Sequence, residues 1–331
     1  MNSKGNFLSQ TDLNSPSKFK KKEYKYIQSL VEFIKEKYGI IFEFDELGEL
    51  LLSACRVNDF NVTETKKRKL FIRNDNVLKW IDEKLLPNTI IVNIGEEDIV
   101  RLLIFCIEIT YQMFEGGTKA TITQKGFRER RRTFESILID QFVGKLGEIM
   151  VKKFFKEKFF TKIELDWEIS TQIEKYRNDI VNADKRVSIK TSPSLTGVWA
   201  EAGIGYDYGI SVKCSVPQPI LLQFFIEVCG FSRLLDFAQV KIPPTDKRFK
   251  NYLQEMRTRI KNYKCGEIQT KLKGFINGYF KTSEHKPVKE GKMFPYLGKV
   301  RETRYLVPIN KLKYTPKDWE IFLKEVGLIK K

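Results

Sequence analysis

The chain contains a single histidine, His285, among 331 residues. This scarcity excludes ββα-metal nucleases, paired-histidine phosphodiesterases, RNase A-like catalysts and histidine-rich metal sites, since most of these need two well-placed imidazoles. His285 lies in a polar, loop-like stretch, KTSEHKPVKEGK, and we expect it to be solvated and uninvolved in chemistry. Any catalysis must then come from carboxylates, lysines and hydroxyls.

Other common signatures are also missing. The cysteines are odd in number, widely spaced and without a CxxC pair, which excludes a disulfide framework and a zinc site. No apolar run approaches the ~20 residues of a membrane span, and the N-terminus lacks the apolar core of a signal peptide. The glycines of EAGIGYDYG fit neither a Rossmann fingerprint nor a P-loop. We therefore expect a cytoplasmic protein with no membrane association, whose thiols are small core residues: Cys55, Cys106, Cys214, Cys229 and Cys265.

Basic residues, by contrast, are abundant. Lysine and arginine number 59 against 42 acidic residues, a formal charge of +17. Such a surplus attracts polyanions, and nucleic acid is the first candidate; the alternative is a basic surface that only opposes aggregation. Two segments concentrate the charge, although the first can also be read as a solvated charge run. The candidate phosphate contacts are Lys125, Arg128, Arg130, Arg131 and Arg132, then Lys247, Arg248, Arg257 and Arg259.

The pattern of apolar residues predicts a mostly helical first third and a mixed remainder. We expect a disordered basic arm (1–22), a helical N-terminal region (23–117), a core (118–242) and a basic C-terminal region that completes the fold (243–331). The predicted helices span 22–38, 43–55, 77–86, 96–114 and 246–264, followed by a final helix with Thr315 as N-cap, Pro316 in the first turn and Gly327 as stop. The predicted strands span 88–94, 210–216, 220–228 and 305–309, the last at a sheet edge because of Pro308, and 197–209 is predicted as a loop.

The stretch 141–192 carries the candidate chemistry, and it opens with a helix. The helix has an apolar stripe: Phe142, Leu146, Ile149, Met150 and Phe154. Glu148 lies away from this stripe, so a plain surface glutamate is the alternative to a site residue. Gly144 and Gly147 flank Glu148 and would let a backbone or ligand approach closely.

A β-hairpin is predicted to follow. Asn182–Lys185 has turn composition, and a four-residue loop would pair Val181 with Arg186 and set Asp179 opposite Ser188. Since alternate residues share a face of a strand, two faces are expected. One face would carry Asp179, Ser188 and Lys190, and the other would carry Ile180, Val187 and Ile189 into the core.

The order of these residues resembles the motif of the PD-(D/E)XK nuclease superfamily, over roughly residues 140–230. That motif has a glutamate on a helix, an aspartate on a strand and a lysine at the end of an x-x-Lys on the next strand. GKLGE resembles its helix acid, Asp179 its first strand acid and Ser188-Ile189-Lys190 its (D/E)XK. The sequence departs from the pattern at Asn178, which replaces a proline at a position where many members vary, and at Ser188, which replaces the second acid. Because of the second change, Glu148 would have to supply the missing negative charge at the metal, and catalysis with one metal ion or impaired catalysis stays open.

The resemblance implies an α/β fold with a central mixed β-sheet flanked by helices, and metal-assisted phosphodiester hydrolysis. It implies Mg²⁺, or alternatively Mn²⁺, held by Glu148, Asp179 and the Ile189 carbonyl, with Ser188 beside it and Lys190 orienting water. The class most resembled is the type II restriction endonuclease, typically a homodimer on double-stranded DNA. Transposition or junction-resolving nucleases of the same fold, and a non-catalytic nucleic-acid-binding protein, stay open. So does a second Ser-x-Lys, Ser211-Val212-Lys213, after Asp207.

Overall fold

The computed structural model describes residues 6–9, 21–60, 63–64, 69–93, 96–115, 134–167, 178–214, 216, 240, 247, 250–251, 254–255, 258 and 271–329. The basic cluster at 125–132 and the predicted strand 220–228 lie outside these ranges, as does most of the predicted helix 246–264. Within them, no helix is both long and apolar enough to cross a membrane.

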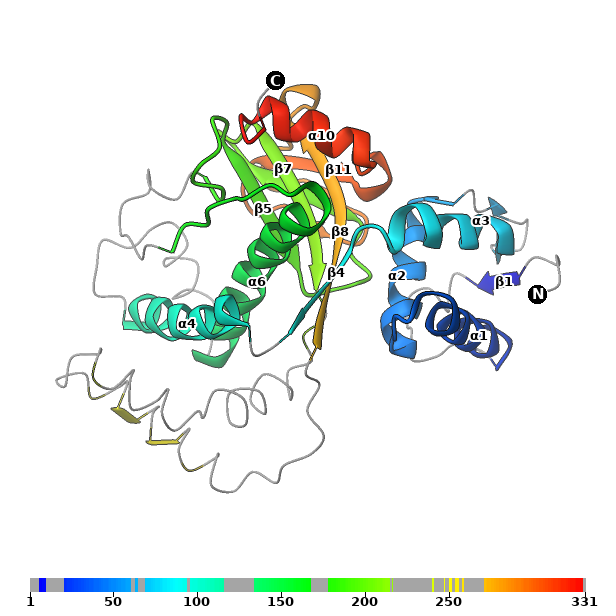
Figure 1. Cartoon of the computed structure of the whole chain (residues 1–331), viewed down its shortest axis with the longest axis horizontal. Helices are drawn as coiled ribbons and strands as arrows, with labels where there is room; N and C mark the ends of the chain where they lie inside the picture. The colour runs from blue at the N-terminus through cyan, green and yellow to red at the C-terminus, as the bar shows by residue number, and fades with distance from the viewer. Residues whose placement is uncertain are drawn as a thin grey trace.

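A four-stranded mixed sheet forms the centre of the molecule (Figure 1). Its strand order is β4-β8-β7-β5, and only β5 and β7 run parallel. The strands are β4 (Thr89–Asn93), β8 (Lys271–Lys281), β7 (Tyr208–Cys214) and β5 (Val187–Ser192). The predicted α/β class with a mixed sheet flanked by helices is confirmed at this level.

The helices α4 (Glu97–Glu115), α6 (Phe134–Phe159) and α10 (Pro316–Glu325) share one hydrophobic core with this sheet. Alternate residues of β7 face this core, among them Ile210 and Val212, because successive side chains of a strand point to opposite faces. On the opposite face of the sheet, β7 has a glycine, Gly209, where the ring of Phe280 packs against the strand. A Cβ at this position would collide with that ring. α10 begins with the predicted N-cap, Thr315, and Asp318 reciprocates to complete a capping box.

A two-stranded antiparallel sheet, β6 (Trp199–Gly203) with β11 (Arg304–Pro308), packs on that opposite face. Ala200 and Ala202 join Phe280 and Val307 in its small core. The prediction of a loop over 197–209 is therefore wrong, whereas β11 does lie at a sheet edge as expected. Beyond it, a short hairpin pairs β9 (Met293–Phe294) with β10 (Gly298–Lys299).

The N-terminal helices build a separate core of their own. They are α1 (Lys21–Tyr38), α2 (Phe44–Arg56) and α3 (Asn74–Trp80), the last continuing as a π-helical turn, η3 (Ile81–Leu85). A small sheet, order β1-β3-β2, joins β1 (Asn6–Ser9), β3 (Lys69–Ile72) and β2 (Thr63–Glu64). Part of the arm predicted to be disordered thus forms a strand. Short 3-10 turns, η5 (Thr282–Glu284) and η6 (Ile309–Lys311), complete the described elements.

Two elements of the predicted N-terminal region, β4 and α4, belong to the main core, and β8 comes from the predicted C-terminal region. Cys55, Cys106 and Cys214 are buried free thiols, as predicted. His285 is half-buried, with its ring 5.6 Å from that of Phe280, so it is less solvated than expected.

Candidate active site

Asp179 is fixed along the free edge of β5. Its backbone N–H donates to the Val187 carbonyl at 3.0 Å, and its Oδ2 accepts from the backbone N–H of Ile189 at 2.6 Å. These two bonds bracket Ser188, the residue that we expected opposite Asp179. The aspartate side chain therefore occupies a position that a neighbouring strand's backbone would otherwise take.

The regular hairpin does not form, however. Val181 N–H donates to the Glu164 carbonyl, and Arg186 N–H donates to Asp207 Oδ2, so the predicted Val181–Arg186 pair is wrong. Asn178 holds the turn instead. Its Oδ1 accepts from Val187 N–H at 3.0 Å and its amide donates to the Lys185 carbonyl at 3.2 Å. The side-chain amide of Asn178 thus closes the loop that carries Asp179.

α6 brings Glu148 to the same place. Where β5 crosses the helix, a Cβ on Gly147 would overlap the side chain of Thr191, and Thr191 Oγ1 donates to the Gly144 carbonyl at 3.2 Å. Gly147 therefore admits β5 to within contact of the helix, and the group that approaches is a protein side chain, whereas the Cβ position of Gly144 faces open space.

The carboxylate of Glu148 is largely buried, with 13% of its side chain exposed. Burial first, and then the negative charge of Asp179, raises the pKa of Glu148 to about 8. Lys145, one helical turn earlier, opposes this shift by donating to Glu148 Oε2 at 2.6 Å. Sequence analysis missed Lys145, although its i,i+3 spacing from Glu148 was visible.

The side chain of Lys145 is buried and has further fixed partners besides Glu148. Its ammonium also donates to the Asp166 carbonyl and lies 5.2 Å from the ring centres of both Phe105 and Trp167. A buried lysine with fixed partners is thereby placed beside the candidate acid, where it offsets part of the negative charge.

Burial also raises the pKa of Asp179, and Lys190 is the largest influence that lowers it. Lys190 lowers the pKa of Glu148 as well. The three side chains named by the sequence motif are thus close enough to influence one another electrostatically. Lys190 itself is exposed to solvent at the edge strand, where a polyanion could reach it.

Ser188 behaves differently. Its side chain is completely buried, and its Oγ has no hydrogen-bond partner among the described residues. It points away from Val187 and Ile189, toward the face covered by β6, since its neighbour on β7 is Gly209. No contact recorded within those residues brings Ser188 to either carboxylate, so its place beside the candidate site remains a prediction.

The donor set fits a divalent cation only in part. No cluster of three or more His, Cys, Asp or Glu side chains suited to a metal occurs within the described ranges. Asp179 and Glu148 each have one carboxylate oxygen engaged in a hydrogen bond, and the second oxygen of each has no hydrogen bond to any residue that the structure describes. Because the N–H of Ile189 points to the free edge of β5, its carbonyl points there too. Two carboxylate oxygens and a carbonyl are hard ligands of the kind that Mg²⁺ accepts, with water completing its shell.

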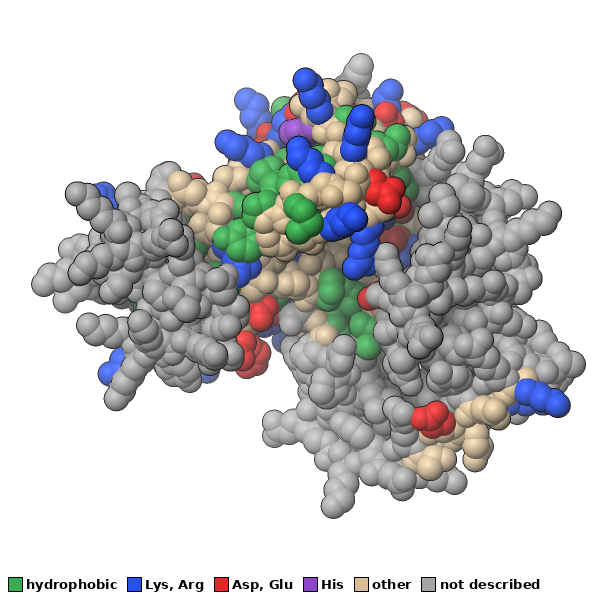
Figure 2. Space-filling view, turned by 180° about the vertical axis from the view of Figure 1, so that it is seen from behind, with side chains coloured by type: hydrophobic (Ala, Val, Ile, Leu, Met, Phe, Trp, Pro, Cys, Tyr) green, Lys and Arg blue, Asp and Glu red, His purple; other side chains and the backbone are tan. Residues whose placement is uncertain are grey.

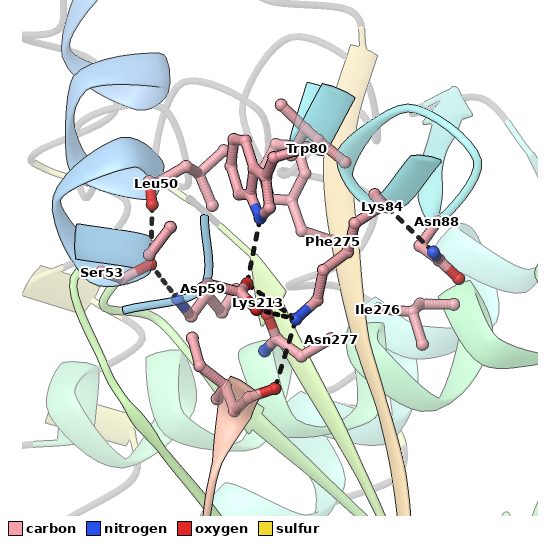
Figure 3. A pocket seen from close by; sticks show the side chains of 13 residues that line it. Leu50, Ser53, Asp59, Trp80, Lys84, Asn88, Lys213, Phe275, Ile276 and Asn277 are labelled. Atoms are coloured by element: carbon pink, nitrogen blue, oxygen red, sulfur yellow. Dashed lines mark hydrogen bonds and ion pairs between the residues drawn. The ribbon is translucent and has the colours of Figure 1, made fainter. Parts of the chain in front are cut away.

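The alternative motif, Ser211-Val212-Lys213, lies in a closed environment. Lys213 is fully buried on β7 beneath the N-terminal helices, and its Nζ donates to Ser53 Oγ at 2.7 Å (Figure 3). Burial lowers the pKa of Lys213 to about 7. The nearby cavity has a volume of about 20 Å³, room for a single water, so no substrate phosphate fits there.

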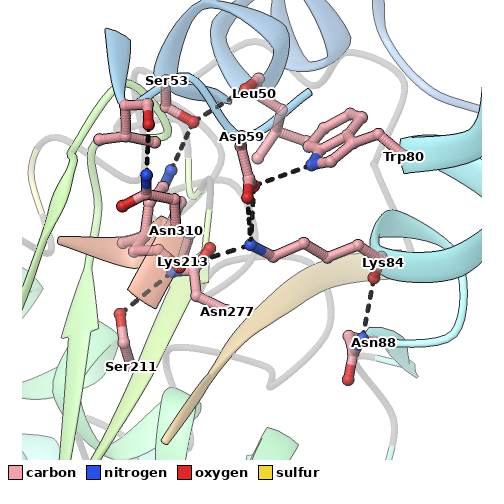
Figure 4. Close-up of polar contacts among 12 residues, drawn as sticks. Leu50, Ser53, Asp59, Trp80, Lys84, Asn88, Ser211, Lys213, Asn277 and Asn310 are labelled. Atoms are coloured by element: carbon pink, nitrogen blue, oxygen red, sulfur yellow. Dashed lines mark hydrogen bonds and ion pairs between the residues drawn. The ribbon is translucent and has the colours of Figure 1, made fainter. Parts of the chain in front are cut away.

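The acid facing this cavity is already fully engaged. Both Asp59 oxygens accept from Lys84 Nζ, at 2.7 and 2.8 Å, and Trp80 Nε1 adds a third bond (Figure 4). Asp207, which precedes the motif, lies about 20 Å away at the other end of β7, by the rise of an extended strand. The second Ser-x-Lys is thus structural, joining the N-terminal helices to the sheet.

Of the predicted phosphate contacts, only Lys247 falls within the described residues, where it is exposed. The others, Lys125, Arg128, Arg130, Arg131, Arg132, Arg248, Arg257 and Arg259, lie outside them. Comparison of the chain with protein-family models, curated proteins and solved structures finds no match.

Proposed function

We propose that this protein is a metal-dependent endonuclease that hydrolyses phosphodiester bonds of double-stranded DNA. One observation carries the proposal: Glu148 from α6 and Asp179 at the edge of β5 lie together in a half-buried place, where the charge of Asp179 raises the pKa of Glu148. Two carboxylates that repel one another in a shielded place are stabilised by a shared cation. An exposed lysine, Lys190, stands beside them at the open edge of the sheet.

Asp179, Glu148 and the Ile189 carbonyl would hold Mg²⁺, with Mn²⁺ as the alternative, and the ion would supply a bound water of lowered pKa and positive charge against the phosphate. The protein's own groups perform the positioning. Ile189 N–H fixes the Asp179 carboxylate at 2.6 Å. Lys190 can orient the attacking water or stabilise the negative charge that builds on the phosphate. Lys145 keeps Glu148 partly neutralised before DNA arrives.

The finer reading is a site-specific type II restriction enzyme with a restriction-endonuclease-like core, acting as a homodimer in the cytoplasm. The unassigned regions around one small catalytic centre suit an enzyme that must also read sequence. One centre per chain suits a two-fold dimer that cuts both strands. A nuclease of transposition or junction resolution uses the same chemistry on another DNA structure.

Digestion of supercoiled plasmid with Mg²⁺, with Mn²⁺ and with EDTA tests the proposal. Discrete fragments that disappear with EDTA support a site-specific endonuclease, and a smear supports a non-specific one. Plasmid that stays intact in both metals would contradict nuclease activity. The buried Ser188 would then mark a non-catalytic nucleic-acid-binding protein, which retention of duplex binding would identify.

A further inference from the structure

The segment 285–301 carries a dense group of exposed cations that the sequence analysis did not single out. Figure 2 shows Lys and Arg side chains gathered on the face that carries the histidine, with hydrophobic side chains among them. We call this group the basic face; all five of its cations are exposed: Lys286, Lys289, Lys292, Lys299 and Arg301.

The charge of the basic face is not neutralised by its neighbours. Of the nearby acids, Glu284 binds Lys313 at 2.7 Å and Glu302 binds Arg304. Glu201 on β6 also binds Arg304. Glu290, exposed within the segment itself, has no ion pair among the described residues, so the five cations and this one acid leave a net charge of +4. No ion pair within the described part of the chain involves any cation of the basic face. Its positive field therefore extends into solvent.

The hairpin β9–β10, which carries two of these lysines, is firmly held. Trp199 Nε1 donates to the Pro295 carbonyl at 2.7 Å, and the rings of Trp199 and Phe294 meet edge-on at 5.1 Å. Backbone bonds from Gly291 N–H to the Val300 carbonyl and from Val300 N–H to the Lys292 carbonyl close its base. Cations on a preorganised element lose little freedom when they bind, which favours recognition over simple solvation.

The tip of the hairpin presents an aromatic ring in a strained conformation. Tyr296 has φ +60°, uncommon for a residue other than glycine, and its side chain is 60% exposed. Met293 beside it is 68% exposed. The guanidinium of Arg56 lies 4.4 Å from the Tyr296 ring centre and also donates to the Thr196 carbonyl, in the loop after β5. The tip is thus linked to the strand that carries Lys190.

We infer that the basic face is a contact surface for the backbone of duplex DNA, with Tyr296 and Met293 presented to a groove. Exposed cations without ion pairs among the described residues, on the same segment as an exposed ring, match a phosphate backbone with accessible base or sugar faces. The inference rests on the proposed function for the identity of the polyanion. It adds to that proposal a DNA-contact surface built from described residues, which is separate from the basic segments that the sequence analysis named as phosphate contacts.

The test measures binding of the whole chain to a labelled 30-base-pair duplex in EDTA, over a range of salt. A triple variant, Lys289→Gln, Lys292→Gln and Lys299→Gln, is compared with a control that removes three exposed charges near the end of α6: Lys156→Gln, Lys158→Gln and Lys162→Gln. We expect the first to lower the salt slope of log K by about 2–3 and weaken binding at least about tenfold, and the control to change binding less than about twofold. Tyr296→Ala should weaken binding by a factor that stays the same at every salt concentration, because the lost ring carries no charge.

The inference is overturned if the two triple variants bind alike, or if the natural chain binds vesicles of anionic phospholipid but not the duplex. Binding in EDTA separates it from the proposed function. A natural chain that binds the duplex through these lysines but leaves plasmid intact in Mg²⁺ and Mn²⁺ contradicts the nuclease alone. A chain that cuts DNA normally after loss of the three lysines contradicts the basic face alone.

Discussion

Replacement of the buried Lys213 tests how the N-terminal helices are joined to the sheet. Burial holds its pKa at about 7, against 10.5 for an ordinary lysine. Between these values the unfolded chain binds one more proton than the folded chain, so this group's contribution to stability rises with pH. It is lowest below about pH 7, where both states are protonated. A full proton corresponds to about 1.4 kcal/mol per pH unit, which gives a rise of about 2 kcal/mol between pH 7.5 and 9.

Lys213→Met keeps most of the length of the side chain and removes the ammonium group with its charge. We expect this variant to exceed the natural chain in free energy of unfolding near pH 7 by about 1–4 kcal/mol, the usual gain when a buried charge is replaced by an apolar group. The advantage should shrink by about 2 kcal/mol between pH 7.5 and 9. Urea denaturation at several pH values measures both quantities.

Other groups that titrate between pH 7 and 9 contribute equally to the unfolding free energy of the variant and of the natural chain, so their contributions cancel in the difference. The thiols of Cys55, Cys106 and Cys214 are buried, which raises their pKa values, but they are present in both chains. Lys35→Met, at an exposed position on α1, is the matched control and should leave stability nearly unchanged. A difference between Lys213→Met and the natural chain that does not vary with pH would refute this account, as would a variant less stable at every pH.

Three further predictions follow from the candidate site. Asp179→Ala and Lys190→Ala should each reduce plasmid cleavage by at least about 100-fold while duplex binding in EDTA is retained. The cleavage rate at Mg²⁺ concentrations well below saturation should rise with pH and level off above about 8, because Glu148 is protonated below its raised pKa and cannot then bind a cation. Gly147→Ala should lower the free energy of unfolding by about 1–3 kcal/mol through its clash with β5. Gly144→Ala, with no atom within 4 Å of the added methyl, should raise it by about 0.5–1 kcal/mol.

Each of these has a clear contrary result. Full cleavage by either point variant would remove that residue from the site. A rate that is flat from pH 6 to 9 would mean that Glu148 does not act as the ionised ligand. Equal stability of the two glycine variants in thermal or urea unfolding would show that β5 does not press on α6 at Gly147.

Local patterns were enough for much of the fold. Apolar periodicity predicted α1, α4, β4 and β7 to within a few residues, because each buries one face or both against a neighbour. The N-cap at Thr315 and the stop at Gly327, which has φ +77°, were visible as residue types in the right order. β6 was not predicted, since its alanines and glycine gave no strand-like apolar alternation, and its residues pair with residues of β11 that lie 101 to 109 positions later (Gly203 with Arg304, Trp199 with Pro308).

The candidate site was predictable in its residues and less so in its geometry. Glu148, Asp179 and Lys190 do influence one another, but no ladder of opposed residues sets their arrangement. Asn178 and Asp179 use side chains where a hairpin would use backbone, a choice that turn propensity cannot reveal. The burial of Lys213 was unpredictable for a related reason: helices far away in sequence cover its strand.

Titration of the natural chain with Mn²⁺, followed by calorimetry without DNA, tests most directly whether Glu148 and Asp179 hold one cation together. Glu148→Gln and Asp179→Asn keep side-chain shape and should each weaken Mn²⁺ binding at least about tenfold, with the double variant little worse than either alone because the ion needs both. Replacing Glu201, which is paired with Arg304 away from the site, by Gln should leave binding unchanged. Mn²⁺ binding that survives unaltered in both single variants would contradict the proposed metal site.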